Sequence, residues 1–420
     1  MKSLNKHCYL FLLILISTSV IAQERDTVNV DSLNISQKIY PAGDVKETSQ
    51  VLSANDLIES DFPGSWPMFG SDIRMKIGGY IKVDALYDVD GTLDKNQFLM
   101  STIPVEGQPE YDNHGYFSFF SKETRFNIDV RRIGEGKIPL KLFIEGDFFT
   151  SGNQFRLRHA YITAGDFIIG QTWTTLSILE SLPFMIDFAA GDALFGGRTS
   201  QVRYQKNLKE HIKIAVAIES FDLLGIENSN NLPGKSSAQF PLFATRVDFN
   251  WKTGLIVIGS SVGQIRWDGG SVGTSTALQI DGVIAGRQYI GKNNYFAWNI
   301  SAGKGSGENI MAFAGSNANA VLTDNYDLET ISSFAAVLSF MHKWSDRMSS
   351  NFSYAYGWLD TPESRDPLAL KKGGVGHLNL IYRPYKRFSG GIEYMWGAQR
   401  TTDDSYGNAS RIQTMVKFEF

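Results

Sequence analysis

From Ile73 to the end of the chain, apolar and polar residues alternate with a period of two. Such alternation is typical of β-strands, because successive side chains point to opposite faces. The sixteen segments that carry the pattern are 73–89, 124–131, 140–148, 155–164, 166–172, 198–206, 211–220, 243–252, 254–266, 276–289, 293–303, 331–343, 347–358, 374–383, 387–398 and 410–420. The sequence therefore predicts an all-β fold of about 16 antiparallel strands.

Many of these strands are long, and charges follow their polar face from end to end. About ten residues of tilted strand cross a bilayer, whereas strands of soluble sheets average five or six. A dry sandwich core would not accept the charged faces. Aromatic residues near strand ends suit two membrane-interface girdles, although high β-propensity explains them equally well. They are Tyr295, Trp298, Tyr354, Tyr356, Trp358, Tyr394 and Trp396.

The final strand, Arg411 to Phe420, alternates strictly and ends on an aromatic residue. The face with Ile412, Val416 and Phe418 would meet lipid. A soluble domain could also end on such a strand. In an outer-membrane barrel, we expect the segment that ends at Phe420 to engage the barrel-assembly machinery.

Turns of two lengths connect the predicted strands. Short turns such as 134–136 and 207–209 alternate with long loops at 90–115, 222–241, 305–329 and 359–372. Short turns on one side and long loops on the other are characteristic of outer-membrane barrels.

The first 22 residues have the pattern of a secretion signal. Lys2 and Lys6 provide a basic start, an apolar run begins at Cys8, and Ala22 precedes the cut. Cys8 is the only cysteine, so the mature chain would have no disulfide and no thiol chemistry.

Residues 23–60 form a polar segment that we expect to be a periplasmic leader, with a short helix from Ser53. The barrel is then predicted to span 61–420. No apolar run after Ala22 approaches the roughly 18 residues of a membrane helix, so a spanning fold must be a closed barrel. Without Lys2 and Lys6, the net charge of -4 becomes about -6 (-4 minus 2), which leaves no basic footprint for nucleic acid.

One segment, Thr172–Gly197, lacks strand alternation and follows the fifth predicted strand. In general porins, the long loop at this place folds inward and narrows the channel. The segment carries bulky apolar residues together with Glu180, Asp187 and Asp192. An ordinary surface loop is the alternative, but such loops seldom carry this many apolar side chains. We therefore expect an inward-folded constriction loop.

Arginines cluster on the polar faces of the predicted strands. They are Arg125, Arg131, Arg156, Arg158, Arg198, Arg203 and Arg246. In an aqueous lumen they would form a ladder opposite Glu180, Asp187 and Asp192 and would orient carboxylates through bidentate contacts. They could equally form wall salt bridges that stiffen the barrel. On the strand with Arg156 and Arg158, we expect both arginines inside and His159 on the opposite face.

No constellation for catalysis, cofactor or metal binding emerges from the sequence. The segment Gly259–Gly263 matches a nucleophile elbow, but that turn requires a helix after the strand, and none is predicted. The glycines of 303–307 lack the Gly-Lys-Ser/Thr of a phosphate loop. The six histidines lack metal-ligand spacing.

Several segments resemble the DcaP-like porins of Gram-negative bacteria, above all Ser60–Asp88. Arg156–Tyr161, Gly170–Leu176 and Gly197–Tyr204 are similar to the same family. The resemblance implies a sixteen-stranded homotrimeric porin in the outer membrane that passes small anionic solutes, including dicarboxylates. It also implies that Arg156, Arg158 and Arg203 line the constriction. Unlike some members, residues 23–60 show no heptads, so a coiled-coil stem is not expected.

The expected function is a passive diffusion channel for small hydrophilic solutes with a preference for anions. Two alternatives remain open: an outer-membrane barrel enzyme such as a lipase, and a structural or adhesive barrel that is plugged by its loops. An enzyme would require a positioned Ser/His/Asp set, and a plugged barrel would not conduct.

Overall fold

The computed structural model describes residues 62–68, 72–134, 138–189, 191–220 and 225–420. The predicted signal peptide, Cys8 and the predicted leader with its short helix lie outside the described residues. Within the described residues, no helix has the length and apolar character needed to cross a membrane.

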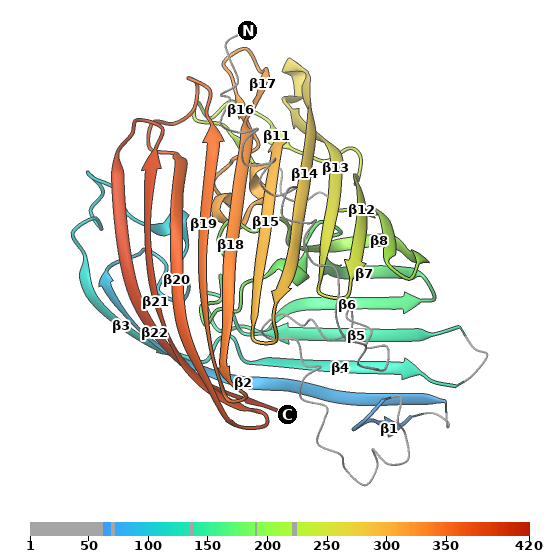
Figure 1. Ribbon diagram of the computed structural model, residues 1–420. Coiled ribbons are helices and arrows are strands. Elements are labelled where there is room, and N and C mark those ends of the chain that lie inside the picture. Colours follow the sequence, from blue (N-terminus) through green and yellow to red (C-terminus); the bar gives the residue numbers. More distant parts are fainter. Residues whose placement is uncertain (1–61, 69–71, 135–137, 190, 221–224) are drawn as a thin grey trace. The chain divides into compact units, whose positions relative to one another are not determined.

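The chain forms a closed antiparallel barrel of 16 strands, as the alternation predicted (Figure 1). The second strand is split into two pieces, and the last strand closes the barrel by pairing with the first, for example Val416 with Val83. In order around the barrel, the strands are β2 (Ile73–Asp90), β3 (His114–Phe120) with β4 (Arg125–Arg132), β5 (Leu140–Asp147), β6 (Arg156–Ala164), β7 (Phe167–Trp173), β8 (Arg198–Lys209), β9 (Ile212–Glu219), β12 (Leu242–Trp251), β13 (Gly254–Asp268), β14 (Thr274–Ile290), β15 (Asn294–Lys304), β18 (Ser332–Ser345), β19 (Met348–Asp360), β20 (Leu370–Tyr385), β21 (Phe388–Thr401) and β22 (Tyr406–Glu419).

The alternation separates an apolar outer face from a polar inner face. On β22, Ile412, Val416 and Phe418 are 39–49% exposed, whereas Arg411 and Gln413 are at most 1% exposed. The exposed apolar side chains point outward, where a membrane replaces water. The buried polar ones point into the barrel, where inward-folded loops cover them.

The structure differs from the sequence prediction in the second strand. We expected a loop as far as residue 115, but His114–Phe120 forms β3, which pairs with the C-terminal part of β2, residues 84–90. After a break the strand continues as β4, which pairs with the N-terminal part of β2, residues 73–80. The aromatic run Tyr116–Phe120 hides the alternation, so the periodicity of the sequence did not reveal β3.

One of the predicted girdle residues does not lie at the membrane interface. Tyr295 of β15 is buried and faces the barrel interior.

The barrel wall is uneven in height. Strands β4 to β7 have 7–9 residues, and we call them the low wall. Strands β18 to β22 have 13–16 residues, and we call them the tall wall. Figure 1 shows the low wall in teal and the tall wall in orange and red.

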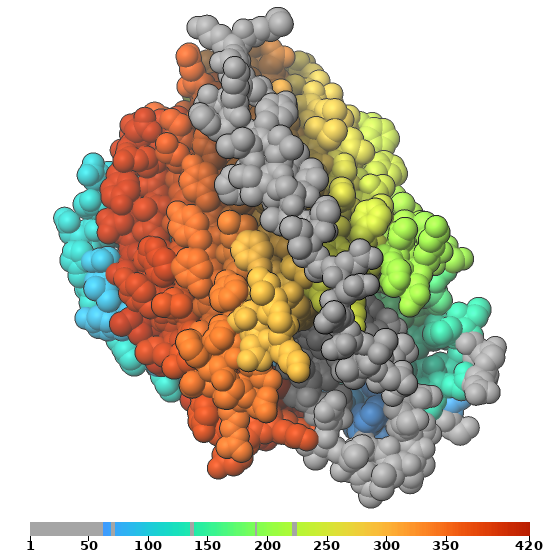
Figure 2. All heavy atoms as spheres, viewed as in Figure 1, coloured from blue at the N-terminus to red at the C-terminus, as the bar shows by residue number. Residues whose placement is uncertain are grey.

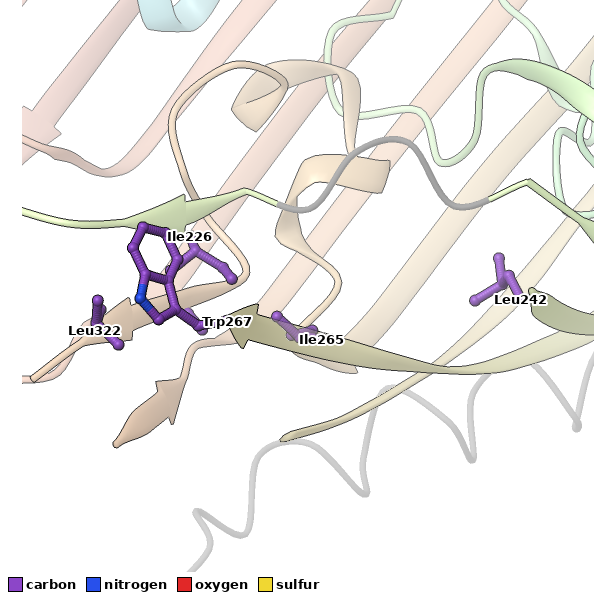
Figure 3. Close-up of a cluster of buried hydrophobic side chains, with 6 residues drawn as sticks. Ile226, Leu242, Ile265, Trp267 and Leu322 are labelled. Carbon is purple, nitrogen blue, oxygen red and sulfur yellow. The ribbon is translucent and has the colours of Figure 1, made fainter. Parts of the chain in front are cut away.

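At the long-loop end, two loops fold inward and form a small sheet of β10 (Ile226–Glu227), β16 (Ala320–Leu322) and β17 (Leu328–Thr330). Ile226 and Leu322 pack on Ile265 and Trp267, the inner face of β13 (Figure 3). The remaining short elements are β1 (Trp66–Pro67), β11 (Lys235–Ser236), and the 3-10 turns η3 (Met100–Thr102), η4 (Leu179–Ser181), η5 (Gly270–Val272), η6 (Gly307–Asn309) and η7 (Met311–Phe313).

Candidate pore constriction

The loop 174–197, between β7 and β8, runs inside the barrel. The carboxylate of Glu393 on the tall wall accepts the backbone N–H groups of Ile186 (2.7 Å) and Asp187 (3.1 Å). Asn379 donates to the carbonyl of Phe184 (2.7 Å), and the Lys82 ammonium donates to that of Ile186 (2.6 Å). These wall side chains project into the barrel, so the loop lies where its apolar content predicted. We call it the constriction loop.

The first half of the constriction loop is tied to further strands. Glu219 of β9 accepts the Thr175 N–H (2.6 Å), and Asn299 of β15 donates to Ser181 (3.1 Å). The loop carboxylate of Glu180 lies 3.3 Å from the Arg246 guanidinium of β12. Burial by itself would raise the pKa of Glu180, but the Arg246 and Lys213 charges, together with hydrogen bonds to the carboxylate, hold that pKa below its ordinary value. Glu180 is therefore a charged anchor to the wall.

Two loop carboxylates hold a neighbouring loop, 91–113. Asp187 accepts the Phe98 N–H at 3.2 Å, and Asp192 accepts the Met100 N–H at 2.5 Å. Both carboxyl groups are buried, at 2% and 0% exposure. This differs from the expectation that they face an arginine ladder across the pore. A buried carboxylate that caps backbone N–H groups presents no charge to the open lumen.

Burial raises the pKa of both carboxyl groups, to about 6 for Asp187 and to about 7 for Asp192. For Asp192, the second carboxyl oxygen has no hydrogen-bond partner among the described residues, which leaves the ionised form under-solvated. A pKa raised in the folded state gives stability that is complete in acid and is lost as pH rises through that pKa. The contact between the two loops should therefore weaken as pH rises from 5 to 8.

We expect the Phe98 and Met100 amides to exchange hydrogen faster at pH 8 than at pH 5, after correction for intrinsic exchange rates. Hydrogen-exchange mass spectrometry of the peptide around Met100 measures this change. Asp192→Asn imitates the protonated carboxyl group and should flatten the pH dependence. Equal corrected rates at both pH values in the native protein would contradict this account.

On the low wall, three of the predicted arginines share two carboxylates. Arg158 lies 2.9 Å from both Glu145 and Asp147, Arg156 lies 2.8 Å from Asp147, and Arg125 lies 3.9 Å from Glu145. Arg158 is only 2% exposed. These contacts neutralise much of the positive charge and fit the alternative of wall salt bridges. Glu145 and Asp147 are two residues apart on β5, just as Arg156 and Arg158 are two residues apart on the neighbouring β6. This matching spacing of opposite charges is a signal that the sequence analysis did not use.

The other arginines lie apart from this network. Arg131 pairs with Asp129 (2.7 Å), nearer the short-turn end. Arg246 pairs with Asp248 (2.5 Å) as well as with Glu180. Arg203 donates to the carbonyl of Trp173. The arginines therefore do not form one continuous ladder. They lie in separate groups, and most of them form ion pairs with Asp or Glu side chains.

Arg198 differs from its neighbours. Its guanidinium stacks on the indole of Trp173, 4.6 Å from the ring centroid. Within the described part of the chain it has no ion pair, and its side chain is half-buried rather than fully buried. An unneutralised guanidinium at the start of β8 is free to attract an anion.

Aromatic side chains bring the constriction loop close to the low wall. Phe188 of the loop stacks on Phe149 at 3.8 Å, and the Arg156 guanidinium lies 5.5 Å from the Phe188 ring. A hollow beside this contact is lined by loop residues 182–188 and by Tyr80, Lys82, Glu123, Arg125, Ile381, Met415 and Lys417. These ring contacts bring Phe188 of the constriction loop against Phe149 and Arg156 at the low wall.

A register shift on β6 changes one predicted facing. We expected His159 on the face opposite Arg156 and Arg158, but Glu145 pairs with His159 and Gly146 pairs with Leu157. The β-bulge brings His159 to the inner face, where its Nδ1 lies 3.1 Å from the Thr172 hydroxyl. A bulge adds a residue to one strand and so reverses the facing beyond it.

The serine of the elbow-like segment has no catalytic surroundings. Ser261 lies within β13 and donates to Asp281 of β14 at 2.7 Å, and no histidine among the described residues forms a hydrogen bond with either side chain. In the described residues, no group of three or more His, Cys, Asp or Glu side chains is arranged to hold a metal ion.

Comparisons with known proteins place this geometry in context. The family model described as DcaP outer membrane protein matches residues 29–420. The outer membrane channel DcaP of Acinetobacter baumannii is 20% identical, with a TM-score of 0.74, and covers 84% of this chain and 100% of its own. An anion-selective porin from Comamonas acidovorans is 9% identical (TM-score 0.57; 83% and 100% covered), and a trimer form of OmpT from Vibrio cholerae is 12% identical (TM-score 0.54; 83% and 100%). No curated protein sequence matches the chain.

Proposed function

This chain belongs to the DcaP outer membrane protein family, a family of outer-membrane channels, and from that premise we propose that it is a passive porin that prefers small anions such as dicarboxylates. Its selectivity would come from pore width and lining charge, without an energy source and without catalysis. The remaining parts of the proposal are removal of a signal peptide at residues 1–22, insertion into lipid by the barrel-assembly machinery and assembly as a homotrimer.

The guanidinium of Arg198 carries the anion preference in this proposal, because it has no ion pair among the described residues and stacks on Trp173 instead. Arg156 supports it, since its side chain remains 33% exposed although it pairs with Asp147. The carboxylates Asp187 and Asp192 do not oppose it, because both are buried against loop 91–113.

The reversal potential across a planar bilayer in a salt gradient tests this function. We expect the purified protein to conduct and to give a reversal potential of the sign that indicates anion preference. Conductance with cation preference would leave a porin but overturn the role of Arg198. A protein that inserts without any conductance would instead favour the loop-plugged barrel.

The low wall supports a homotrimer. Strands of 7–9 residues fall at or below the roughly 9–11 residues that cross a bilayer. Beside the low wall, on the long-loop side, β3 pairs only with β2 among the described strands, so the other edge of β3 has no partner strand there. An open sheet edge is not tolerated in lipid. A second copy of the chain would cover this edge and the outward Phe117 and Phe119, which are 64% and 68% exposed.

The double substitution of Phe117 and Phe119 by Ser should therefore dissociate the trimer. Light scattering of the detergent-solubilised protein measures the oligomer. Ser at Phe340 and Phe352, on the outer face of the tall wall, is the matched control and should leave the trimer intact. If the native protein is monomeric, or if both double variants remain trimers, the low wall is not the interface.

A further inference from the structure

A cationic pair lies on the outer face of the tall wall. Cross-strand pairing places Lys372 of β20 beside Arg400 of β21. Cross-strand partners share one face of a sheet. Leu378 is an even number of residues from Lys372 on β20, and Tyr394 is an even number from Arg400 on β21, so each shares a face with its cation; both are exposed. Glu393, on the opposite face of β21, is buried inside the barrel. Lys372 and Arg400 therefore point away from the pore.

The pair is flanked by aromatic residues and lies above a groove. Trp358 pairs with Lys372 on one side, and Tyr406 pairs with Arg400 on the other. Next to them is a groove of about 350 Å³, lined by Asp90, Tyr354, Gly374, Tyr394, Trp396, Gly397, Ala398, Tyr406, Asn408, Ala409 and Ser410. Its floor depends on small residues: a Cβ at Gly374 would lie 2.3 Å from the Tyr354 hydroxyl. Figure 2 shows the outer surface of this wall in orange and red.

Neither cation is neutralised by a carboxylate among the described residues. Lys372 has no ion pair or hydrogen bond there. Arg400 stacks over Tyr406 (5.0 Å) and donates one N–H to the backbone carbonyl of Asp404 (3.0 Å), which leaves its other donors available. The Asp404 carboxylate instead lies 3.6 Å from Lys371. The two cations retain their charge for a partner from outside the protein.

The height of the pair in the membrane identifies that partner. Lys372 and Arg400 lie at the long-loop ends of their strands, and long loops are extracellular in outer-membrane barrels. The aromatic residues around them suit a membrane–water interface. The outer leaflet at this level consists of phosphorylated glycolipids, whose phosphates are anionic and whose acyl chains are apolar. A cationic pair above an aromatic groove complements both parts of such a lipid.

We propose that Lys372 and Arg400 bind a phosphate of an outer-leaflet glycolipid, while the groove over Gly374 and Ala398 receives one of its acyl chains. The site lies on the lipid face of the barrel, so it is independent of solute passage. A guanidinium beside an ammonium offers several charge-assisted hydrogen bonds to one phosphate group.

Binding of bis-phosphorylated lipid A to the purified full-length protein, measured by native mass spectrometry, tests the site. K372Q/R400Q should bind about tenfold to thirtyfold more weakly, since each basic residue near a membrane surface contributes on the order of a factor of five. Lys304→Gln removes an exposed cation from the end of β15, outside the groove, and should bind as the native protein does. Heat-modifiable gel mobility verifies that each variant is folded.

Ala398→Phe fills the groove without changing charge and should also weaken binding, whereas lipid A without phosphates should bind poorly to the native protein. Native-like affinity of K372Q/R400Q, an equal loss with Lys304→Gln, or equal binding of the dephosphorylated lipid would each overturn the proposal. Displacement of the lipid by millimolar inorganic phosphate would also overturn it, because the groove would then contribute nothing.

Discussion

Replacing Glu393 by Ala should convert a steady channel into one that closes repeatedly. The native carboxylate accepts the N–H groups of Ile186 and Asp187 and also contacts Asn379 (3.0 Å) and His377 (3.0 Å). All of these contacts are buried. Each buried donor left without its partner costs about 1–3 kcal/mol. The variant therefore loses both Glu393 contacts to the centre of the constriction loop, and of the wall hydrogen bonds there, those from Asn379 and Lys82 remain. A detached loop can move from the tall wall into the lumen.

Single-channel recording measures this effect as a severalfold increase in closing events and a lower mean conductance. Glu393→Gln retains one acceptor oxygen and should lie between the native protein and Glu393→Ala. Ser389→Ala, on the same inner face of β21, is the control and should conduct as the native protein does. Native-like recordings from Glu393→Ala would mean that other contacts hold the loop.

The second large effect concerns two arginines on neighbouring parts of the wall: Arg198 of β8 should set selectivity, and Arg158 of β6 should set stability. Arg198→Gln removes a guanidinium that has no acidic partner among the described residues, so it leaves no carboxylate exposed. A unit charge about 5 Å from an ion contributes on the order of 1 kcal/mol even in water. The ratio of anion to cation permeability, taken from the reversal potential, should fall by at least about fourfold.

Arg158→Gln should instead destabilise the barrel, because it leaves Glu145 and Asp147 partly uncompensated in a buried site. Removing one partner of a buried ion pair typically costs about 3–5 kcal/mol. The temperature of the heat-modifiable gel shift measures the loss. Adding Glu145→Gln rebalances the charge and should recover much of it. A stable Arg158→Gln protein whose selectivity changes as much as that of Arg198→Gln would refute the division.

The sequence alone determined the barrel, because its signal is local. A strand must show its lipid face and its lumen face at every second residue, so the pattern from Ile73 to Phe420 contained the strand number and the facing of most side chains. The bulky residues of Thr172–Gly197 likewise indicated a loop that is covered by protein. Where the alternation is hidden, as in the aromatic run of β3, or interrupted by a bulge, as before His159, the prediction failed.

Only the tertiary structure decided which charges meet. Ile186 and Glu393 are 207 residues apart, and no periodicity links them. The same holds for Asp192, whose partner is the backbone of Met100 rather than an arginine. Arg158 became a buried structural cation, because the pairing of β5 with β6 and the bulge in that pairing place Glu145 and Asp147 beside it, whereas Arg198 has no ion pair among the described residues. Partners of the inward loops depend on distances across the lumen, which exist only in the closed barrel, and partners within the wall depend on the register of neighbouring strands, which a bulge can shift.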